Sequence, residues 1–428
     1  MSGIELLLCF VVLLFFKVPL GVSFVMSSVF YLLSNDLSII CVAQRMVNSI
    51  SYSSPLLAVP LFIFLGSLMN NTKLTDKIFD VASLFVGSVR GGLAYVNVLA
   101  SLIFAGISGA ALADVGGLGN IEIRAMRDEG YDDGTTMGVT LASSTIGPIF
   151  PPSIPLIVYA TVAEVSAVRL LIAGIVPALV IVVFLCLLIA FFGRKKNYPV
   201  HSSELSPKEK RKVLKEALPV LILPLFLVGS LLLGWFGPTE IGAVACVYTI
   251  LISRFVYKEL SLQKFWLSVR EGVRSTALIM FTVSAASVFG WCLTVSQVPQ
   301  SLTSSMFSIS KNPIVLLIFT NLLLLIVGMF MESISAILVM TPLITPMLVQ
   351  VGIDPVHIGI VMVLNLMIGL LTPPVGMSLY MGSIVAGISF EETTKYVLPW
   401  LLVLLLSLVV VTFVPQFSLW LPNLIFGK

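Results

Sequence analysis

The sequence predicts an all-α polytopic membrane protein with two inverted-topology repeats, each containing a re-entrant hairpin and a broken helix. The first indication is composition. Of the 428 residues, 58% are hydrophobic and 11% are charged, and mean hydropathy is +1.09. Soluble proteins carry about 25% charged residues. The apolar runs have helical lengths, which favours a helical bundle over a β-barrel. The other indications are two proline-interrupted apolar segments and a charge pattern that places equivalent segments on opposite membrane faces.

The first interrupted segment, residues 137–163, contains the run S-S-T-I-G-P-I-F-P-P-S-I-P at 143–155. Proline removes a backbone donor and clashes with the preceding turn, so the helix must break there. Lipid cannot satisfy the freed peptide groups, and such a break persists only beside protein or a water-filled cavity. The sequence therefore predicts a binding site at this break.

A second interrupted segment repeats the first at an offset of 222 residues. It reads M-I-G-L-L-T-P-P-V-G-M at 367–377. The same offset takes Gly106 to Gly328 and Pro152 to Pro374, with no gap between these positions. A constant offset over this length indicates an internal duplication.

The first repeat is expected to begin with a retained span, because its N-terminus lacks the basic region of a signal peptide. A segment of mixed polarity suits a helix that lies along the membrane interface. A glycine-rich stretch suits a hairpin with its tip near Ser108 and Gly109. The expected elements are spans at 4–16 and 20–33, the interfacial helix at 37–54, apolar runs at 55–69 and 78–89, the hairpin at 93–123, the broken helix at 137–163 and a span at 170–192.

The second repeat is expected to replay this order, with the tip of its hairpin near Glu332. The expected elements are spans at 217–235 and 241–255, an interfacial helix at 260–275, a span at 276–295, the hairpin at 314–346, the broken helix at 361–383 and a last span at 397–414.

Basic residues set the expected orientation, because they accumulate on the cytoplasmic side. The connector at 193–216 has eight basic and three acidic residues, and the region 254–274 has five and two. The counterpart of that region, at 37–54, has one basic residue. Equivalent segments therefore fall on opposite faces, and both chain ends are expected outside the cytoplasm.

Several function classes are disfavoured. The chain has no G-x-x-x-x-G-K-[ST] loop for ATP, and its two histidines make a Ser-His-Asp triad improbable. An intramembrane enzyme would need a nucleophile with a base or a paired-acid site. Asp114 and Glu332 do not align between the repeats, so we expect no enzyme. A channel would normally show rings of charge or carbonyls around an oligomeric pore.

Inverted repeats with discontinuous helices are typical of secondary transporters, whose site lies at the midplane. Half-helix N-termini attract anions, and unwound carbonyls coordinate Na⁺. The expected solute-binding residues lie at the tips and breaks: Ser108, Gly109, Ser143, Ser144, Thr145, Ser333 and Asn365. Small residues also let membrane helices pack closely, which is the alternative role for each of them. Asp114 and Glu332 are either functional acids or water-exposed caps.

Four motifs carry a family resemblance that extends over essentially the whole chain. They are G-I-S-G-A-A-L-A-D at 106–114, I-G-P-I-F-P-P-S-I-P at 146–155, G-M-F-M-E at 328–332 and L-L-T-P-P-V-G at 370–376. With them the chain resembles the large membrane (M) subunit of tripartite ATP-independent periplasmic (TRAP) transporters, in the ion-transporter superfamily. The resemblance implies an elevator-type importer of carboxylate-bearing solutes with Na⁺ in the bacterial inner membrane. It also implies two partners, a small four-helix membrane subunit (Q type) and a soluble periplasmic substrate-binding protein (P type). Because the sequence starts directly on a large-subunit span, the small partner is expected to be a separate protein.

The resemblance also implies Na⁺ ligands, two or more ions being expected. In the first repeat these are Gly106, Ser108, Gly147 and Ser153, and in the second they are Gly328, Gly369, Thr372 and Gly376. The two ion sites should differ chemically, because the duplication aligns Phe150 with Thr372 and Ser153 with Val375. The residues do not decide between sialic acid (N-acetylneuraminate) and a C4-dicarboxylate, and we favour sialic acid. The remaining alternative is a stand-alone Na⁺/carboxylate symporter.

An elevator mechanism implies that each repeat has a static part and a moving part. The first inverted repeat, 1–192, comprises a scaffold at about 1–77 and a transport part at about 78–192. The second, 217–428, comprises a scaffold at about 217–297 and a transport part at about 298–414, and the connector 193–216 joins the repeats.

Overall fold

The computed structural model describes residues 1–51, 54–86, 89–196, 198 and 206–427, and every regular element within these ranges is a helix. Seven of the described helices are long and apolar enough to cross a membrane. The bent pair Ile40–Ser51 and Pro55–Asn71 adds an eighth candidate. The prediction of an all-α polytopic membrane protein is confirmed.

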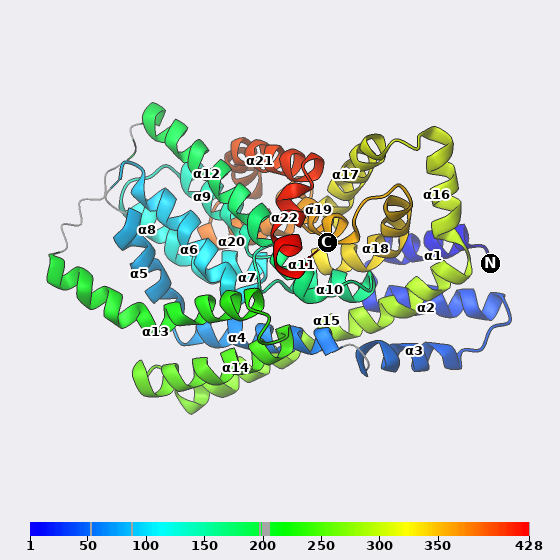
Figure 1. Ribbon diagram of the computed structural model, residues 1–428, viewed down its shortest axis with the longest axis horizontal. Helices are drawn as coiled ribbons and strands as arrows, with labels where there is room; N and C mark the ends of the chain where they lie inside the picture. Colours follow the sequence, from blue (N-terminus) through cyan, green and yellow to red (C-terminus); the bar gives the residue numbers. More distant parts are fainter. Residues whose placement is uncertain (52–53, 87–88, 197, 199–205, 428) are drawn as a thin grey trace.

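The first repeat contains the predicted hairpin and broken helix (Figure 1). Its elements are α1 Gly3–Phe15, α2 Leu20–Ser34, α3 Ile40–Ser51, η1 Ser54–Leu57, α4 Ala58–Asn71, α5 Leu74–Val86, α6 Gly92–Ser108, α7 Ala111–Gly116, α8 Leu118–Asp128, α9 Asp133–Ser143, η2 Ser144–Ile146, α10 Ile154–Val162, α11 Ala167–Ala173 and α12 Ile175–Lys196. The hairpin turns between α6 and α7, and the break separates η2 from α10.

The second repeat follows the first at the predicted offset. Its elements are α13 Pro207–Leu232, α14 Pro238–Leu251, η3 Ile252–Val256, α15 Leu262–Val295, α16 Val298–Ile309, α17 Pro313–Phe330, α18 Ser333–Gln350, α19 Pro355–Gly369, α20 Met377–Ala386, α21 Phe390–Phe413 and α22 Gln416–Phe426. Adding 222 to Ile40, where α3 begins, gives Leu262, where α15 begins. The Pro151–Pro152 and Pro373–Pro374 peptide bonds, which the offset also relates, are both cis.

The two repeats differ where an interfacial helix was expected. In the second repeat the predicted helix at 260–275 and span at 276–295 form the single helix α15. The first repeat instead places α3 at 72° to the helix that follows it. Pro55 starts that following helix, whereas its equivalent in α15 is Ala277. Without a proline, α15 continues for 34 residues, about 51 Å at 1.5 Å per residue, which exceeds the hydrocarbon thickness of a bilayer.

Helices α2, α3, α4, α14 and α15 form a layer along one long edge of the molecule (Figure 1). The helix α15 packs against α2, α3 and α4, and α14 packs against α4. Aromatic rings join α1 to two of these elements, because Phe10 of α1, Phe24 of α2 and Phe289 of α15 lie with ring centroids 4.9 to 5.1 Å apart. The hairpins and broken helices lie over this layer.

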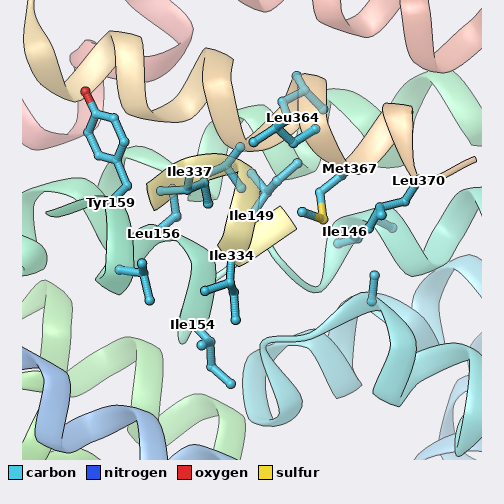
Figure 2. Close-up of a cluster of buried hydrophobic side chains, with 14 of the residues drawn as sticks. Ile146, Ile149, Ile154, Leu156, Tyr159, Ile334, Ile337, Leu364, Met367 and Leu370 are labelled. Carbon is cyan, nitrogen blue, oxygen red and sulfur yellow. The ribbon is translucent and has the colours of Figure 1, made fainter. Parts of the chain in front are cut away.

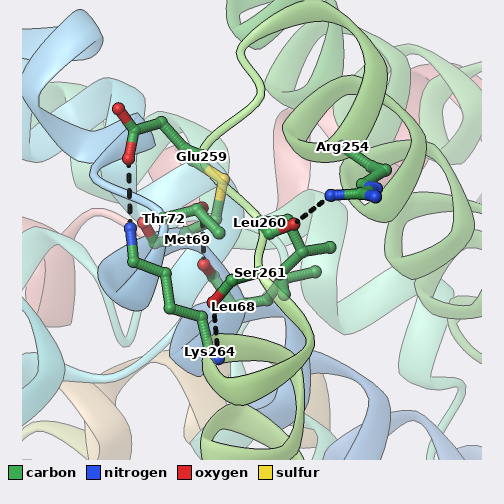
Figure 3. A network of polar contacts seen from close by, with 8 residues as sticks. All are labelled: Leu68, Met69, Thr72, Arg254, Glu259, Leu260, Ser261 and Lys264. Carbon is green, nitrogen blue, oxygen red and sulfur yellow. Dashed lines mark hydrogen bonds and ion pairs between the residues drawn. The ribbon is translucent and has the colours of Figure 1, made fainter.

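Polar contacts fix the loop that enters α15 beside the end of α4 (Figure 3). Lys264 Nζ lies 3.0 Å from a carboxylate oxygen of Glu259, and Arg254 donates to the carbonyl of Leu260 at 3.2 Å. The hydrogen bond and charge of Lys264 hold the pKa of the Glu259 carboxyl below its usual value. Thr72 ends α4 by donating to the carbonyl of Leu68.

The connector predicted at 193–216 is helical at both ends. The helix α12 extends to Lys196, and α13 begins at Pro207. Ser206 caps α13 by accepting from the backbone N–H of Glu209 at 3.3 Å. Residues 197 and 199–205 lie outside the described part of the chain.

Candidate substrate and ion site

The first hairpin tip packs against the first break. The helix α6 ends at Ser108, and Gly109 has φ +61°, which is costly for a residue with a side chain. A Cβ at Gly109 would lie 2.3 Å from the carbonyl oxygen of Pro152. Gly109 accepts a hydrogen bond from the N–H of Ile154 at 3.4 Å. Glycine at the tip therefore allows the hairpin backbone to contact the unwound segment directly.

The second hairpin tip packs against the second break through a pair of glycines. A Cβ on Gly369 would lie 2.6 Å from the Cα of Gly328. The N–H of Gly376 donates to the carbonyl of Met329 at 3.3 Å, and Gly376 has φ +49°. The structure therefore brings together Gly328, Gly369 and Gly376, three of the four Na⁺ ligands predicted in this repeat.

Hydroxyl groups lie in both unwound segments. Ser153 caps α10 by accepting from the N–H of Leu156 at 3.2 Å, and its hydroxyl donates to the carbonyl of Pro148. In the second repeat Thr372 donates to the carbonyl of Ile368 at 2.8 Å. Among the described atoms, the buried hydroxyl of Ser108 has no hydrogen-bond partner. Hydroxyl and carbonyl oxygens of this kind suit a hard cation.

The glycines predicted as Na⁺ ligands in the first repeat have different neighbours. A Cβ on Gly106 would meet Pro224 of α13 at 3.0 Å and Phe150 at 3.5 Å. A Cβ on Gly147 would meet no atom closer than 3.6 Å, and Ala110 of the hairpin tip lies 3.8 Å from it. The hairpin and the break thus meet in both repeats, but through different residues. The ion-binding roles of both sets stay predictions.

A cavity of about 500 Å³ lies where both hairpin tips face α4 and α15. Ser108 and Ser333, two of the predicted solute-binding residues, line it together with Glu332. Parts of both breaks also reach it, through Pro148 and Leu370. The side chain of Glu332 caps α18 by accepting from the N–H of Ser335 at 3.2 Å. The cavity therefore joins elements from both repeats, as expected for a site at the centre of an inverted pair.

Five predicted solute-binding residues lie outside the lining of this cavity. Gly109 contacts the first break through its close approach to Pro152. The Ser144 and Thr145 hydroxyls, in η2, donate to carbonyls of the preceding helix α9, those of Leu141 and Ala142.

The other two, Ser143 and Asn365, occupy equivalent positions and form equivalent bridges. Ser143 donates to Asn97 of α6 at 2.8 Å, and Asn365 donates to Asn321 of α17 at 2.7 Å. Each bridge ties the first half of a broken helix to the first helix of a hairpin. A contribution of these residues to solute binding stays a prediction.

Sequence reasoning missed the wall that faces the tips. Ser67 and Asn70 of α4, with Ser275 and Thr282 of α15, line the cavity opposite the hairpins. They lie within the helices α4 and α15, so no helix break marks them. The only available signal was their polarity within largely apolar segments.

Apolar packing joins the two repeats around the breaks (Figure 2). Ile146, Ile149 and Ile154 of the first repeat belong to one buried cluster with Ile334 and Met367 of the second. A polar contact adds to it at the edge of the cluster, where the hydroxyl of Tyr159 donates to the carbonyl of Pro355 at 2.8 Å. The hairpins and broken helices of both repeats therefore share one core.

Comparisons with known proteins agree with this architecture. The family model described as "Tripartite ATP-independent periplasmic transporter, DctM component" matches residues 7–417. The chain is 43% identical over 416 residues to the sialic acid TRAP transporter large permease protein SiaM of Vibrio cholerae, which covers 97% of each chain. It is 37% identical to the sialic acid TRAP transporter permease protein SiaT of Haemophilus influenzae, over 98% of this chain and 68% of that protein. It is 38% identical to the C4-dicarboxylate TRAP transporter large permease protein DctM of Pseudomonas aeruginosa, over 86% of each.

Solved transporters share the fold at low identity. The YdaH transporter of Alcanivorax borkumensis matches with a TM-score of 0.64 and 15% identity, over 87% of this chain and 88% of that one. MtrF of Neisseria gonorrhoeae matches with a TM-score of 0.65 and 14% identity, over 91% and 85%. The sequence relatives and the family model together show that this chain belongs to the DctM family of TRAP transporter components and is a large membrane permease of that family.

Proposed function

We propose that this chain is the permease subunit of a secondary active importer in the bacterial inner membrane, which carries a carboxylate-bearing solute together with Na⁺. The observation that carries the proposal is the cavity of about 500 Å³ between the hairpin tips and the α4–α15 wall. Its volume falls within the usual range of about 300 to 1,000 Å³ for small-molecule sites. Both breaks reach it, so a bound solute would contact unwound backbone from each repeat.

N-acetylneuraminate is the solute that we favour. The relative that shares 43% identity over 97% of each chain is named a sialic acid permease, whereas one at 38% is named a C4-dicarboxylate permease. Among the described residues that line the cavity, none is basic. The carboxylate would therefore be met by polar donors such as Ser108 and Ser333 and by the positive end of the α10 dipole, where Ile154 and Pro155 line the cavity.

We use the word junction for each place where a hairpin tip contacts a break. The two junctions suit Na⁺ as the coupling ion. Each junction offers neutral oxygens and exposed backbone, with Ser153 in one break and Thr372 in the other. In our proposal one ion sits at each junction, so that ion binding holds the hairpin tip against the break. Solute affinity would then depend on Na⁺ through the shape of the cavity.

Elevator motion would move the hairpins and broken helices together past α4 and α15. The packing of α10 against α18 and α19 supports this, because separating the repeats there would expose buried side chains to water. Unwound backbone cannot face lipid, and sliding the site as a unit keeps its polar groups covered.

Two partners complete the proposed importer. A small four-helix membrane subunit of the Q type would pack against the large subunit, and a soluble periplasmic binding protein of the P type would deliver the solute. A stand-alone Na⁺/carboxylate symporter would need neither.

The decisive experiment is uptake of radiolabelled N-acetylneuraminate into proteoliposomes that contain this chain and its small subunit. We expect uptake to need an inward Na⁺ gradient and added binding protein. Uptake should not depend on ATP, and excess succinate should inhibit it only weakly. Full uptake in K⁺ buffer without a proton gradient would exclude Na⁺ coupling. Full uptake without the binding protein would favour the stand-alone symporter.

Crosslinking tests the motion. Ser67 of α4 and Leu112 of α7 face the same cavity from the static and moving sides. With the five native cysteines replaced, a crosslink between Ser67→Cys and Leu112→Cys should abolish uptake. The control crosslink joins Leu112→Cys to Met377→Cys, which line another pocket within the moving body, and it should preserve uptake. Preserved uptake with the first crosslink would exclude the elevator.

A further inference from the structure

A second cavity, of about 660 Å³, shares three lining helices with the first, α10, α15 and α18. Along α15, the first cavity is lined between Ser275 and Thr282, and the second between Val283 and Thr294. The helices α10 and α18 pass from one to the other in the same way, and α3 adds a wall to the second cavity. The two cavities therefore occupy successive positions along the boundary between the scaffold and the hairpin body.

The second cavity lies toward the periplasmic face in the predicted orientation. It is at the end of α15 opposite to Arg270 and Arg274, whose charges mark the cytoplasmic side. It also includes residues of α3, the segment predicted to be periplasmic. A solute that enters from the periplasm would meet this cavity before the hairpin tips.

In this cavity a guanidinium group stacks on an aromatic ring. The guanidinium carbon of Arg45 lies 4.3 Å from the ring centroid of Trp291. The backbone carbonyl of Arg45 accepts from the hydroxyl of Ser287 at 3.4 Å, which ties α3 to α15 at this point. Among the described residues, no carboxylate forms an ion pair with Arg45. Stacking on Trp291 fixes the orientation of the planar Arg45 guanidinium group and leaves the N–H donors at its edge available to an anion.

The charges of the two cavities differ. The first has Glu332 and no basic residue among its described lining residues. The second has Arg45, and Glu164, at the turn between α10 and α11, lies in its opposite wall. Arginine binds a carboxylate through two parallel hydrogen bonds, and a positive group at a cavity mouth raises the local concentration of an anion.

We propose that Arg45, held on Trp291, binds the carboxylate of the solute at an outer station from which the solute passes to the hairpin tips. This inference rests on the proposed import of a carboxylate. Arg45 is solvent-exposed and Glu164 opposes it, so the station holds the solute weakly enough to release it. Removal of the Glu164 charge should tighten binding, and removal of the Arg45 charge should weaken it about tenfold or more.

Trp291 provides a direct readout, because no other tryptophan lines either cavity among the described residues. The purified chain with its small subunit, in lipid nanodiscs, is titrated with N-acetylneuraminate while tryptophan fluorescence is recorded. We expect a saturable change that is absent with the methyl ester of the same sugar and absent in Trp291→Phe. Loss of one charge-assisted contact should raise the half-saturation concentration about tenfold or more in Arg45→Gln. Arg45→Lys should lie between Arg45→Gln and the wild type, and Glu164→Gln should lower the value.

Two results would overturn the proposal: no saturable change in the wild type, or an unchanged half-saturation concentration in Arg45→Gln. If Arg45 only fastened α3 to α15, Arg45→Gln would lower the thermal stability and leave ligand affinity unchanged.

Uptake measurements separate this inference from the proposed function. In the complete transporter Arg45→Gln should raise KM with little change in maximal rate. Wild-type proteoliposomes that fail to take up carboxylates refute the proposed function, whereas equal KM values in the variant and the wild type refute the outer station.

Discussion

The two hairpin–break junctions are equivalent by position, yet they close through different contacts. In the second repeat the backbones of Gly328 and Gly369 touch, so that a Cβ on Gly369 would lie 2.6 Å from its partner. Their equivalents, Gly106 and Gly147, do not touch in this way. The first junction instead closes through the positive-φ residue Gly109. Duplication has kept the topology, while each copy has acquired its own tight contact.

The repeats differ again in their static parts. In the first repeat α3 and α4 are separate helices, whereas α15 is continuous. The copies differ here in Pro55 against Ala277, and a proline at this position favours the interruption of the first copy. The comparison shows that local chemistry can alter one copy without moving the rest of its repeat.

The largest expected effect tests the proline account. Ala277→Pro should destabilise α15 by about 3 kcal/mol or more, because it removes a helix hydrogen bond and clashes with the preceding turn. The measurement is thermal unfolding of the purified chain in detergent. Pro55→Ala is the matched control and should cost little. Equal stability of Ala277→Pro and the wild type would mean that position 277 does not decide the continuity of α15.

A smaller effect should distinguish the two junctions. Gly369→Ala should destabilise the protein by about 1 to 3 kcal/mol, because the added methyl group would overlap the backbone of Gly328. Gly147→Ala, at the equivalent position, meets nothing closer than 3.6 Å and should be tolerated. Thermal unfolding and initial uptake rates should both show the asymmetry. Equal losses in the two variants would show that the glycine contact is no tighter in the second repeat than in the first.

The sequence predicted those features that leave a local chemical mark. Prolines at 151–152 and 373–374 located both breaks, and the glycine-rich run around Gly109 located the first hairpin tip. The α4–α15 wall was not predicted, because Ser67 and Ser275 become neighbours of the tips only through tertiary packing. For the same reason, the sequence did not reveal that Ser143 and Asn365 bridge helices within each repeat, and their expected contact with the solute stays a prediction.

The next prediction compares the two hydroxyls at the breaks. Ser153→Ala removes the cap of α10 and should cost about 1 kcal/mol of stability. The hydroxyl of Thr372 donates to a carbonyl in the last turn of α19 and caps no helix N-terminus, so Thr372→Ala should destabilise the protein less than Ser153→Ala does. Both variants should need more Na⁺ for half-maximal uptake if the hydroxyls bind the ion. Unchanged Na⁺ dependence in Thr372→Ala, with normal folding, would remove Thr372 from the ion site.

The smallest expected effect concerns an ion pair that only the second repeat possesses. Glu259 and Lys264 pair at 3.0 Å, whereas their equivalents are Leu37 and Val42. The pKa of Glu259 is lowered by the hydrogen bond and charge of Lys264. A carboxyl with a lowered folded-state pKa stabilises the protein above its unfolded-state pKa, and this stabilisation is lost as pH falls through the folded-state value. Surface ion pairs contribute little to stability and are screened by salt, so the effect should be largest at low ionic strength.

Unfolding temperatures of the wild type and Glu259→Gln should differ near neutral pH and converge in acid below the usual pKa of glutamate. A difference that persists in acid would show that the glutamine acts through packing, and the ion pair would then not contribute to the asymmetry between the repeats.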